Sequence, residues 1–407
     1  MKRFFILLLI LVAIFTIWLL PDEHGDYPVA FERLVSQVFK ETVTPESIKE
    51  RYKAGELTIL LVPGHDPEYP GAEVGDLKES ELTLALATKI KADLEKIGGL
   101  PDGKAGWQVL STRDFVTGKY EPEFATYFER EREAINSFRS QLRHEFASLM
   151  ARGEVAPPAQ EVYHNFAPTE VATRLYGINR WSNDHNVDLT LHLHFNDYPG
   201  RGRTPRYGGF SIYIPERQLP NARVSRELAE TIQRELTQIM PISNLPSEAG
   251  SPVEDQELIA VGANGSRLSA ALLVEYGYLY ESQFKNKIIR EAVLTDLAHR
   301  TVRGLATYFG APKTVPATSL LPHFWGKSLQ TGIKSDRDVL ALQTALHRDG
   351  LYPTVGKNLN SCPINGNFGP CVQAAVVAFQ TRHNLSPATG VVDTPTLAKL
   401  NELYSRQ

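Results

Sequence analysis

The stretch Asp188-Leu189-Thr190-Leu191-His192-Leu193-His194-Phe195-Asn196 is a short, β-rich apolar run that ends in polar residues. Open α/β sheets place their chemistry at the carboxyl ends of such strands. His192 and His194 are two residues apart and therefore project from the same face of a strand. A pair of imidazoles at a strand end indicates a metal site more strongly than a single histidine would.

Two other apolar runs end in the same way, since Leu57–Gly64 leads to His65 and Ala271–Val274 leads to Glu275. Between them, Glu79 stands at the head of a segment with apolar residues at every fourth position, which predicts a helix. Two imidazoles and a carboxylate leave a tetrahedral zinc ion one open position for water, and a further carboxylate can act as general base. The pattern indicates a hydrolase site.

These motifs, in this order, resemble those of the zinc-dependent N-acetylmuramoyl-L-alanine amidases of the amidase-3 type, over roughly residues 56–310. The resemblance rests on Val62-Pro63-Gly64-His65, Glu79 followed by Leu84 and Ala87, Leu193-His194-Phe195-Asn196, and Leu273-Val274-Glu275-Tyr276-Gly277-Tyr278. It implies an α/β fold with an open, mostly parallel or mixed sheet flanked by helices. It also implies that His65, Glu79 and His194 hold one zinc ion per chain, with Glu275 as the catalytic carboxylate.

Several site assignments keep an alternative at this stage. A glutamate such as Glu79 in a first helical turn can simply complement the helix dipole, and Glu81 stands close by. His192 occupies a position where the family usually has a small residue, so it either lies behind the ligands or is an alternative ligand. Asn196 is also expected to lie behind the ligands. Glu275 could instead be buried as the partner of an arginine.

The N-terminus has the pattern of a signal anchor over residues 1–21. Met1-Lys2-Arg3 precedes an apolar run from Phe4 to Leu20 that lacks an Ala-x-Ala cleavage signature, which favours an uncleaved anchor over a cleaved signal peptide. The basic end stays in the cytoplasm, so we expect the rest of the chain in the cell envelope, outside the cytoplasm and anchored in the cytoplasmic (inner) membrane. Residues 22–55 are expected to form a stalk.

An insertion over about residues 119–168 departs from the family pattern. Apolar residues at helical spacing from Phe124 to Leu149 predict one helix of roughly 30 residues. The apolar stripe of such a helix needs a cover, so it either packs on the catalytic domain or meets a partner protein. A further hypothesis is a lid that closes the cleft and is displaced by a regulatory protein.

The C-terminal part has a composition of its own. Residues 311–335 contain Pro312, Pro316 and Pro322 and are expected to form a linker. Residues 336–407 resemble the small, all-α, three-helix peptidoglycan-binding domain of type 1. Cys362 and Cys371 flank its Asn-Gly-x-Phe-Gly loop, and in an exported chain such a pair most simply forms a disulfide.

The overall composition excludes one class of partner. The chain has 407 residues, enough for two or three domains, and a formal net charge of -4 from nearly balanced acids and bases. This charge balance does not indicate a basic surface that would bind nucleic acid. The expected partners are therefore peptidoglycan, the inner membrane through the anchor, and a regulatory protein at the insertion.

The family resemblance implies one reaction, and two alternatives remain beside it. The implied reaction is hydrolysis, by zinc-activated water, of the amide between N-acetylmuramic acid and L-alanine in peptidoglycan. A zinc peptidase acting within the stem peptide would use the same metal chemistry. A non-catalytic wall-binding scaffold is the third interpretation.

Overall fold

The computed structural model describes residues 43–97, 106–157, 167–198, 206–262, 265, 267–311 and 318–405. The predicted signal anchor of residues 1–21 and the first part of the stalk lie outside these ranges. Within the described ranges, none of the helices combines the length and the apolar character needed to span a bilayer.

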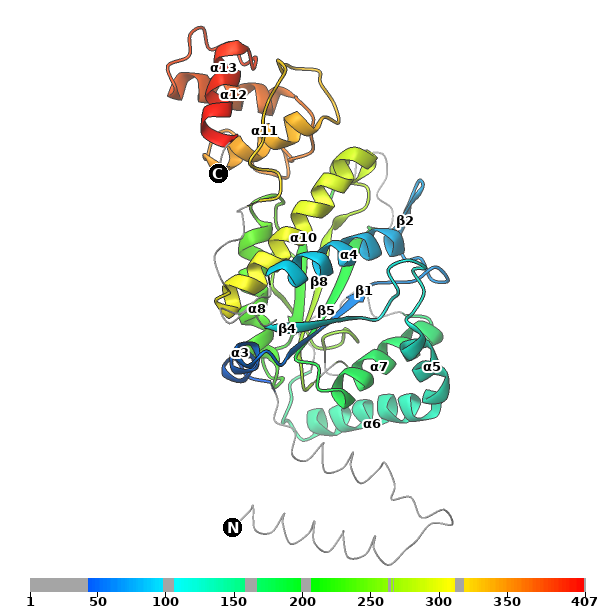
Figure 1. Cartoon of the computed structure of the whole chain (residues 1–407). Coiled ribbons are helices and arrows are strands. Elements are labelled where there is room, and N and C mark those ends of the chain that lie inside the picture. Colours follow the sequence, from blue (N-terminus) through cyan, green and yellow to red (C-terminus); the bar gives the residue numbers. More distant parts are fainter. Residues whose placement is uncertain are drawn as a thin grey trace, which may run out of the picture. The chain divides into compact units, whose positions relative to one another are not determined.

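A six-stranded mixed sheet forms the centre of the fold, in the order β4-β1-β5-β8-β6-β7 (Figure 1). Strands β4, β1, β5 and β8 run parallel, whereas β6 is antiparallel to β8. The predicted open, mixed α/β sheet is thus confirmed. The strands are β1 (Leu57–Pro63), β4 (Trp107–Ser111), β5 (Leu189–Asn196), β6 (Ser211–Pro215), β7 (Val253–Asp255) and β8 (Ala270–Tyr278), with a separate hairpin of β2 (Glu73–Val74) and β3 (Leu77–Lys78).

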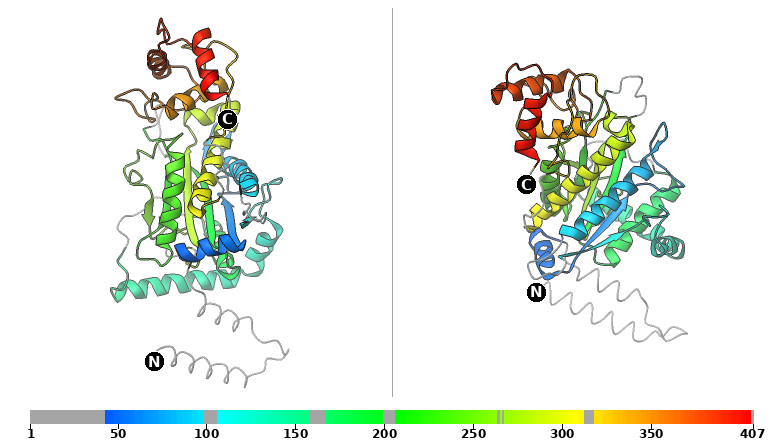
Figure 2. Two further views of the ribbon diagram at one scale, coloured as in Figure 1. Left: turned by 60° about the vertical axis from the view of Figure 1, so that its left-hand side comes forward. Right: turned by 45° about the horizontal axis from the view of Figure 1, so that its top comes forward.

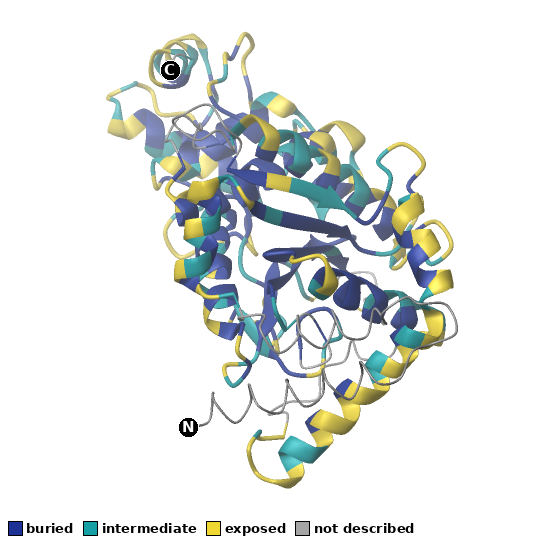
Figure 3. Ribbon diagram, turned by 60° about the horizontal axis from the view of Figure 1, so that its bottom comes forward, coloured by how far each residue is buried: buried dark blue, intermediate teal, exposed yellow. Residues whose placement is uncertain are grey.

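Helices cover both faces of this sheet. One face carries α4 (Glu79–Ile97), α8 (Ala222–Leu236) and α10 (Lys287–Phe309), and α4 and α10 lie side by side across it (Figure 2). The other face carries α5 (Pro122–Arg130), α6 (Arg132–Ala151) and α7 (Thr169–Asp184). The short α9 (Ser282–Lys285) precedes α10. The central strands are accordingly buried on both sides (Figure 3).

The alternation of side chains along β5 decides which face bears the polar residues. Leu189, Leu191, Leu193 and Phe195 enter the large core beneath α4 and α10, where each is at most 1% exposed. The intervening side chains, which include the two histidines, therefore face the α7 side. A shift of one residue in the pairing of β5 would exchange these sets and bury the histidines in the apolar core.

The predicted 30-residue helix in the insertion is wrong in one respect, because two helices take its place. The chain turns at Glu131, between α5 and α6, and Glu131 pairs there with Arg180 of α7 at 3.1 Å. The turn lets two short apolar stripes reach the same core, which a straight helix could not do. Phe124 and Phe128 of α5 and Ile135 of α6 pack on α7 and β1, so the domain itself covers this part of the insertion.

The predicted stalk of residues 22–55 also needs correction at its end. Residues Pro45–Ala54 form α3, which begins with a capping box between Thr44 and Ser47. Ile48 and Tyr52, four residues apart, are buried in the main core, and the Tyr52 ring lies 5.0 Å from that of Phe309. This helix is therefore part of the α/β domain.

The C-terminal region is helical, with α11 (Arg337–Arg348), α12 (Pro370–Arg382) and α13 (Thr394–Tyr404). A disulfide joins Cys362 to Cys371. The second half of the predicted linker packs onto these helices, since Trp325 is 1% exposed and its indole N–H donates to the Asp338 carbonyl at 2.9 Å. Residues 312–317 of the linker are outside the described ranges.

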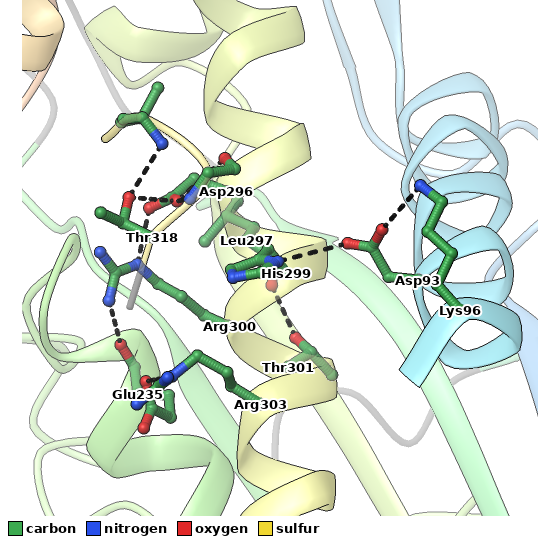
Figure 4. A network of polar contacts seen from close by, with 12 residues as sticks. Asp93, Lys96, Glu235, Asp296, Leu297, His299, Arg300, Thr301, Arg303 and Thr318 are labelled. Atoms are coloured by element: carbon green, nitrogen blue, oxygen red, sulfur yellow. Dashed lines mark hydrogen bonds and ion pairs between the residues drawn. The ribbon is translucent and has the colours of Figure 1, made fainter. Parts of the chain in front are cut away.

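A buried carboxylate holds the chain that follows α10. Asp296 accepts hydrogen bonds from Arg300 Nε at 2.6 Å, from the Thr318 hydroxyl at 2.6 Å and from the Ser319 amide at 2.6 Å (Figure 4). Asp296 is 0% and Arg300 3% exposed. Arg300 also donates to the carbonyl of Glu235 at the end of α8, so one ion pair joins three segments.

We expect the Asp296→Ala substitution to lower the free energy of unfolding by about 3–5 kcal/mol, because it leaves the Arg300 guanidinium buried without its carboxylate. Urea titration followed by circular dichroism measures the change. The matched control is Glu95→Ala, which breaks the exposed Lys91–Glu95 pair on α4 and should cost less than about 0.5 kcal/mol. Equal effects of the two substitutions would contradict this account of the network.

Candidate metal centre

Three side chains from separate parts of the chain meet at the carboxyl end of the sheet. The donor atoms of His65, Glu79 and His194 all lie within 4.8 Å of one another. His65 Nε2 is 3.1 Å from Glu79 Oε2, and His194 Nδ1 is 2.9 Å from Glu79 Oε1. The structure therefore brings together the three residues that the sequence singled out as zinc ligands.

Each of the three residues is positioned by a different element. His65 follows β1 and has a left-handed backbone, with φ of 64°. His194 lies on the neighbouring strand β5, and the Gly64 amide donates to the Leu193 carbonyl at 2.8 Å. Glu79 begins α4, and its oxygens also accept the Ala72 and Phe195 amides at 3.0 and 3.2 Å. Glu79 is thus fixed on both oxygens, which favours Glu79 over Glu81 as the candidate ligand.

Arg113 and Thr83 hold the two ligand-bearing segments together from behind. Arg113 is 1% exposed and donates to the Ser80 carbonyl at 3.0 Å and to the Gly64 carbonyl at 3.4 Å. The Thr83 hydroxyl donates to the same Gly64 carbonyl at 2.7 Å. Arg113 thus ties the residue before His65 to the residue after Glu79, which only the structure shows.

Two glycines make room for the site. A Cβ on Gly64 would lie 2.4 Å from the His194 ring, and a Cβ on Gly71 would lie 2.5 Å from Glu79 Oε2 and 2.6 Å from the His65 ring. Gly71 also has a φ of 75°. The sequence does not single out Gly71, because its role appears only when the loop folds over Glu79.

The electrostatics of the three residues suit a cation. Burial opposes ionisation of Glu79, but His65 and then His194 outweigh it and hold the pKa of this carboxyl well below its ordinary value. Burial likewise opposes protonation of His65, and Glu79 overcomes it and raises the pKa of the imidazole. Two nitrogen donors and one carboxylate oxygen are the ligand set of catalytic zinc sites, which keep one position open.

Glu275 lies beside the candidate ligands on β8, where it pairs in register with His194. Its side chain is buried, and its Oε2 has no hydrogen-bond partner among the described residues. Burial, and then the charges of Glu79 and Glu248, raise the pKa of Glu275 well above the usual range of a carboxyl. No arginine pairs with it in the described part of the chain, which removes the salt-bridge interpretation there.

His192 lies outside the group of ligand atoms, although it faces the same cavity. It is 0% exposed, and neither ring nitrogen has a partner among the described residues. Burial and the neighbouring His194 lower the pKa of His192 to about 3, so its imidazole is neutral at physiological pH. The arrangement favours a place behind the ligands over direct ligation.

Glu248 is a buried residue of the site that sequence reasoning missed. It is 0% exposed and accepts hydrogen bonds from Asn196 Nδ2 at 2.9 Å, the Tyr213 hydroxyl at 2.8 Å and the Tyr278 hydroxyl at 3.1 Å. The composition of residues 241–257 predicts a mobile loop near the cleft. Nothing in its Pro-, Ser- and Glu-rich composition distinguishes Glu248 from an exposed glutamate.

The candidate ligands, Glu275 and His192 line one cavity of about 550 Å³. Its other walls are largely apolar and come from the loop after His65, from α7 and from residues 258–260. Arg174 of α7 also lines it and pairs at 2.8 Å with Asp66, the residue after His65. Among its described residues, the insertion contributes to the lining only near its ends, through Tyr120, Ala167 and Pro168.

Comparison with known proteins assigns the C-terminal region. Residues 335–400 match the family described as "Putative peptidoglycan binding domain". This match confirms the peptidoglycan-binding domain that the sequence predicts over residues 336–407. No curated protein matches the chain.

Several solved structures resemble the larger part of the chain. The CwlD amidase of Clostridioides difficile, in complex with the GerS lipoprotein, is 16% identical with a TM-score of 0.39, over 62% of this chain and 98% of that one. An N-acetylmuramoyl-L-alanine amidase of Clostridium difficile 630 is 18% identical with a TM-score of 0.38, over 62% and 97%. The Ami1 amidase of Mycobacterium smegmatis is 15% identical with a TM-score of 0.38, over the same shares. Because the sequence identities and TM-scores are low, these structures do not establish the function of this chain, and the site itself is the basis for inferring it.

Gly71→Ala should weaken binding of a divalent metal ion at least tenfold, because the added methyl group would displace Glu79 and His65. Competition of the purified protein with a chelator of known zinc affinity measures this change. Gly75→Ala is the matched control, since Gly75 also has a positive φ, 61°, but nothing within 4 Å of the added Cβ. Similar losses in both variants would trace the effect to backbone strain and not to the ligands.

Proposed function

We propose that this chain is a zinc-dependent N-acetylmuramoyl-L-alanine amidase, which hydrolyses the amide between the lactyl group of N-acetylmuramic acid and L-alanine. The observation that carries the proposal is the register of β5 and β8. It places Glu275 directly beside His194 and hence at the group that His65 and Glu79 complete. The peptidoglycan-binding match in the same chain supports a wall polymer as the substrate.

The proposed roles follow from the positions of the side chains. His65, Glu79 and His194 would hold the zinc ion. When bound, the ion supplies Lewis acidity, which polarises the scissile carbonyl and lowers the pKa of water to about 7. Glu275 takes a proton from the attacking water as the C–O bond forms. It then delivers this proton to the leaving nitrogen as the C–N bond breaks, giving a carboxylate and a free amine.

The rest of the chain supports an extracytoplasmic site of action. A disulfide between Cys362 and Cys371 is typical of oxidising compartments outside the cytoplasm. The peptidoglycan-binding domain would keep the catalytic site close to its polymer and so raise the local substrate concentration. Attachment to the cytoplasmic membrane through residues 1–21 remains a prediction.

Control by a partner protein would act through the exposed surface of the insertion. The described part of α6 packs below the sheet through Ile135 and Leu142 and does not line the cavity. Much of its remaining surface is exposed, which leaves a face that another protein could contact. A lid would have to come from the ends of the insertion, near Tyr120 or Pro168.

Glu275→Gln should lower kcat on purified peptidoglycan by about 10²- to 10⁴-fold, because the amide cannot accept the proton of water. The zinc content and the binding to sacculi should stay at the level of the parent protein. Zinc is measured by atomic absorption, and sacculus binding by co-sedimentation. If the parent protein bound sacculi but released no product, the non-catalytic scaffold would be the correct interpretation.

Mass spectrometry of digested peptidoglycan distinguishes the amidase from a peptidase. We expect free stem peptides that begin with an L-alanine amino group, together with glycan strands that keep the lactyl carboxylate. Products cut between two amino acids of the stem would instead assign a zinc peptidase to the same site. Digestion with Glu275→Gln protein serves as the blank.

A further inference from the structure

Asn196 is a cavity-lining residue whose side chain has a fixed orientation. It ends β5, two residues after His194, and lines the same cavity. Its Nδ2 donates to Glu248 Oε1 at 2.9 Å. Glu248 lies behind Asn196 and is not among the residues that line the cavity.

The chemistry of Glu248 decides which end of the Asn196 amide faces the cavity. A carboxylate only accepts hydrogen bonds, so the amide must present its NH2 group to Glu248 and its carbonyl oxygen must point the other way. The Tyr213 and Tyr278 hydroxyls donate to the same carboxylate, so Glu248 is held from β5, β6 and β8 at once. A buried carboxylate is costly unless it is hydrogen-bonded in this way, and simple packing would need only an apolar residue.

We propose that Glu248 locks the Asn196 amide so that its Oδ1 accepts a hydrogen bond from a peptide N–H of the substrate. A peptide N–H is an obligate donor, which suits a fixed acceptor. A sugar hydroxyl both donates and accepts and would not require the orientation to be locked. The inference rests on the proposed function and adds a contact to the stem peptide beside the scissile bond. Asn196 is then a substrate-binding residue and Glu248 a positioning residue.

A charge-conserving exchange tests the proposal. Asn196→Asp alone sets two carboxylates against each other, and we expect KM for a soluble muropeptide to rise about tenfold. Adding Glu248→Gln restores the pair, because the introduced amide donates to the introduced carboxylate, whose second oxygen still faces the cavity as an acceptor. The double variant should return to within about threefold of the parent KM.

Asn196→Leu provides the matched background, because it has nearly the same size but no acceptor. Glu248→Gln should not restore KM in this background. Tyr276→Phe controls for stability, since it removes a buried hydrogen bond to Thr301 on the opposite face of β8, and it should leave KM unchanged. Zinc content and thermal unfolding are recorded for every variant, and dissociation constants for the muropeptide are measured on chelator-treated protein.

The outcomes separate the two proposals. Restoration in the aspartate background alone, both in KM and in the dissociation constant, supports the contact. Restoration in both backgrounds or in neither overturns it, while cleavage by the parent protein still upholds the proposed function. A parent protein that neither binds nor cleaves the muropeptide overturns both.

Discussion

The buried carboxylate of Glu79 is the constraint on which the rest of the site depends. Both of its oxygens are engaged, each with one imidazole and one backbone amide, from β1, β5 and the loop before α4. Removing a carboxylate from water is unfavourable unless such partners compensate. The end of β1, the end of β5 and the start of α4 must therefore all be in place together. This requirement explains why glycines and the Arg113 guanidinium surround the site, since each allows or enforces that approach.

The candidate ligand residues and the sheet could be predicted because each depends on a local pattern. His65, His194 and Glu275 all follow apolar runs, and parallel strands bring such ends to one edge. The polar face of β5 follows from the alternation of apolar and polar side chains along the strand. By contrast, the turn at Glu131 depends on tertiary packing. Apolar residues have the same spacing in two short helices as in one long helix, so the sequence pattern does not reveal the turn. The prediction of a stalk failed at α3 because a short amphipathic helix shows its burial only once Phe309 is in place.

Glu248 shows a different limit of sequence reasoning. Its hydrogen bonds join residues 30 to 52 positions apart in the chain, and no periodicity links them. The sequence also does not show that His192 is buried and neutral. A histidine on the polar face of a strand can either bind an ion or stay neutral. Only the position of its neighbours distinguishes these cases. The side chains that surround the reacting groups are thus harder to predict than the reacting groups themselves.

The short strand at one edge of the sheet limits how copies of this chain can associate. Strand β7, at one margin, has three residues and ends at Asp255, whose carboxylate accepts the amides of Glu257 and Leu258. The chain therefore turns away at once and offers few free backbone groups in a row. Long unpaired margins invite another molecule to add its own strand, which leads to aggregation. Copies of this chain that gather on peptidoglycan through the matched domain can therefore lie side by side without their sheets joining at this margin.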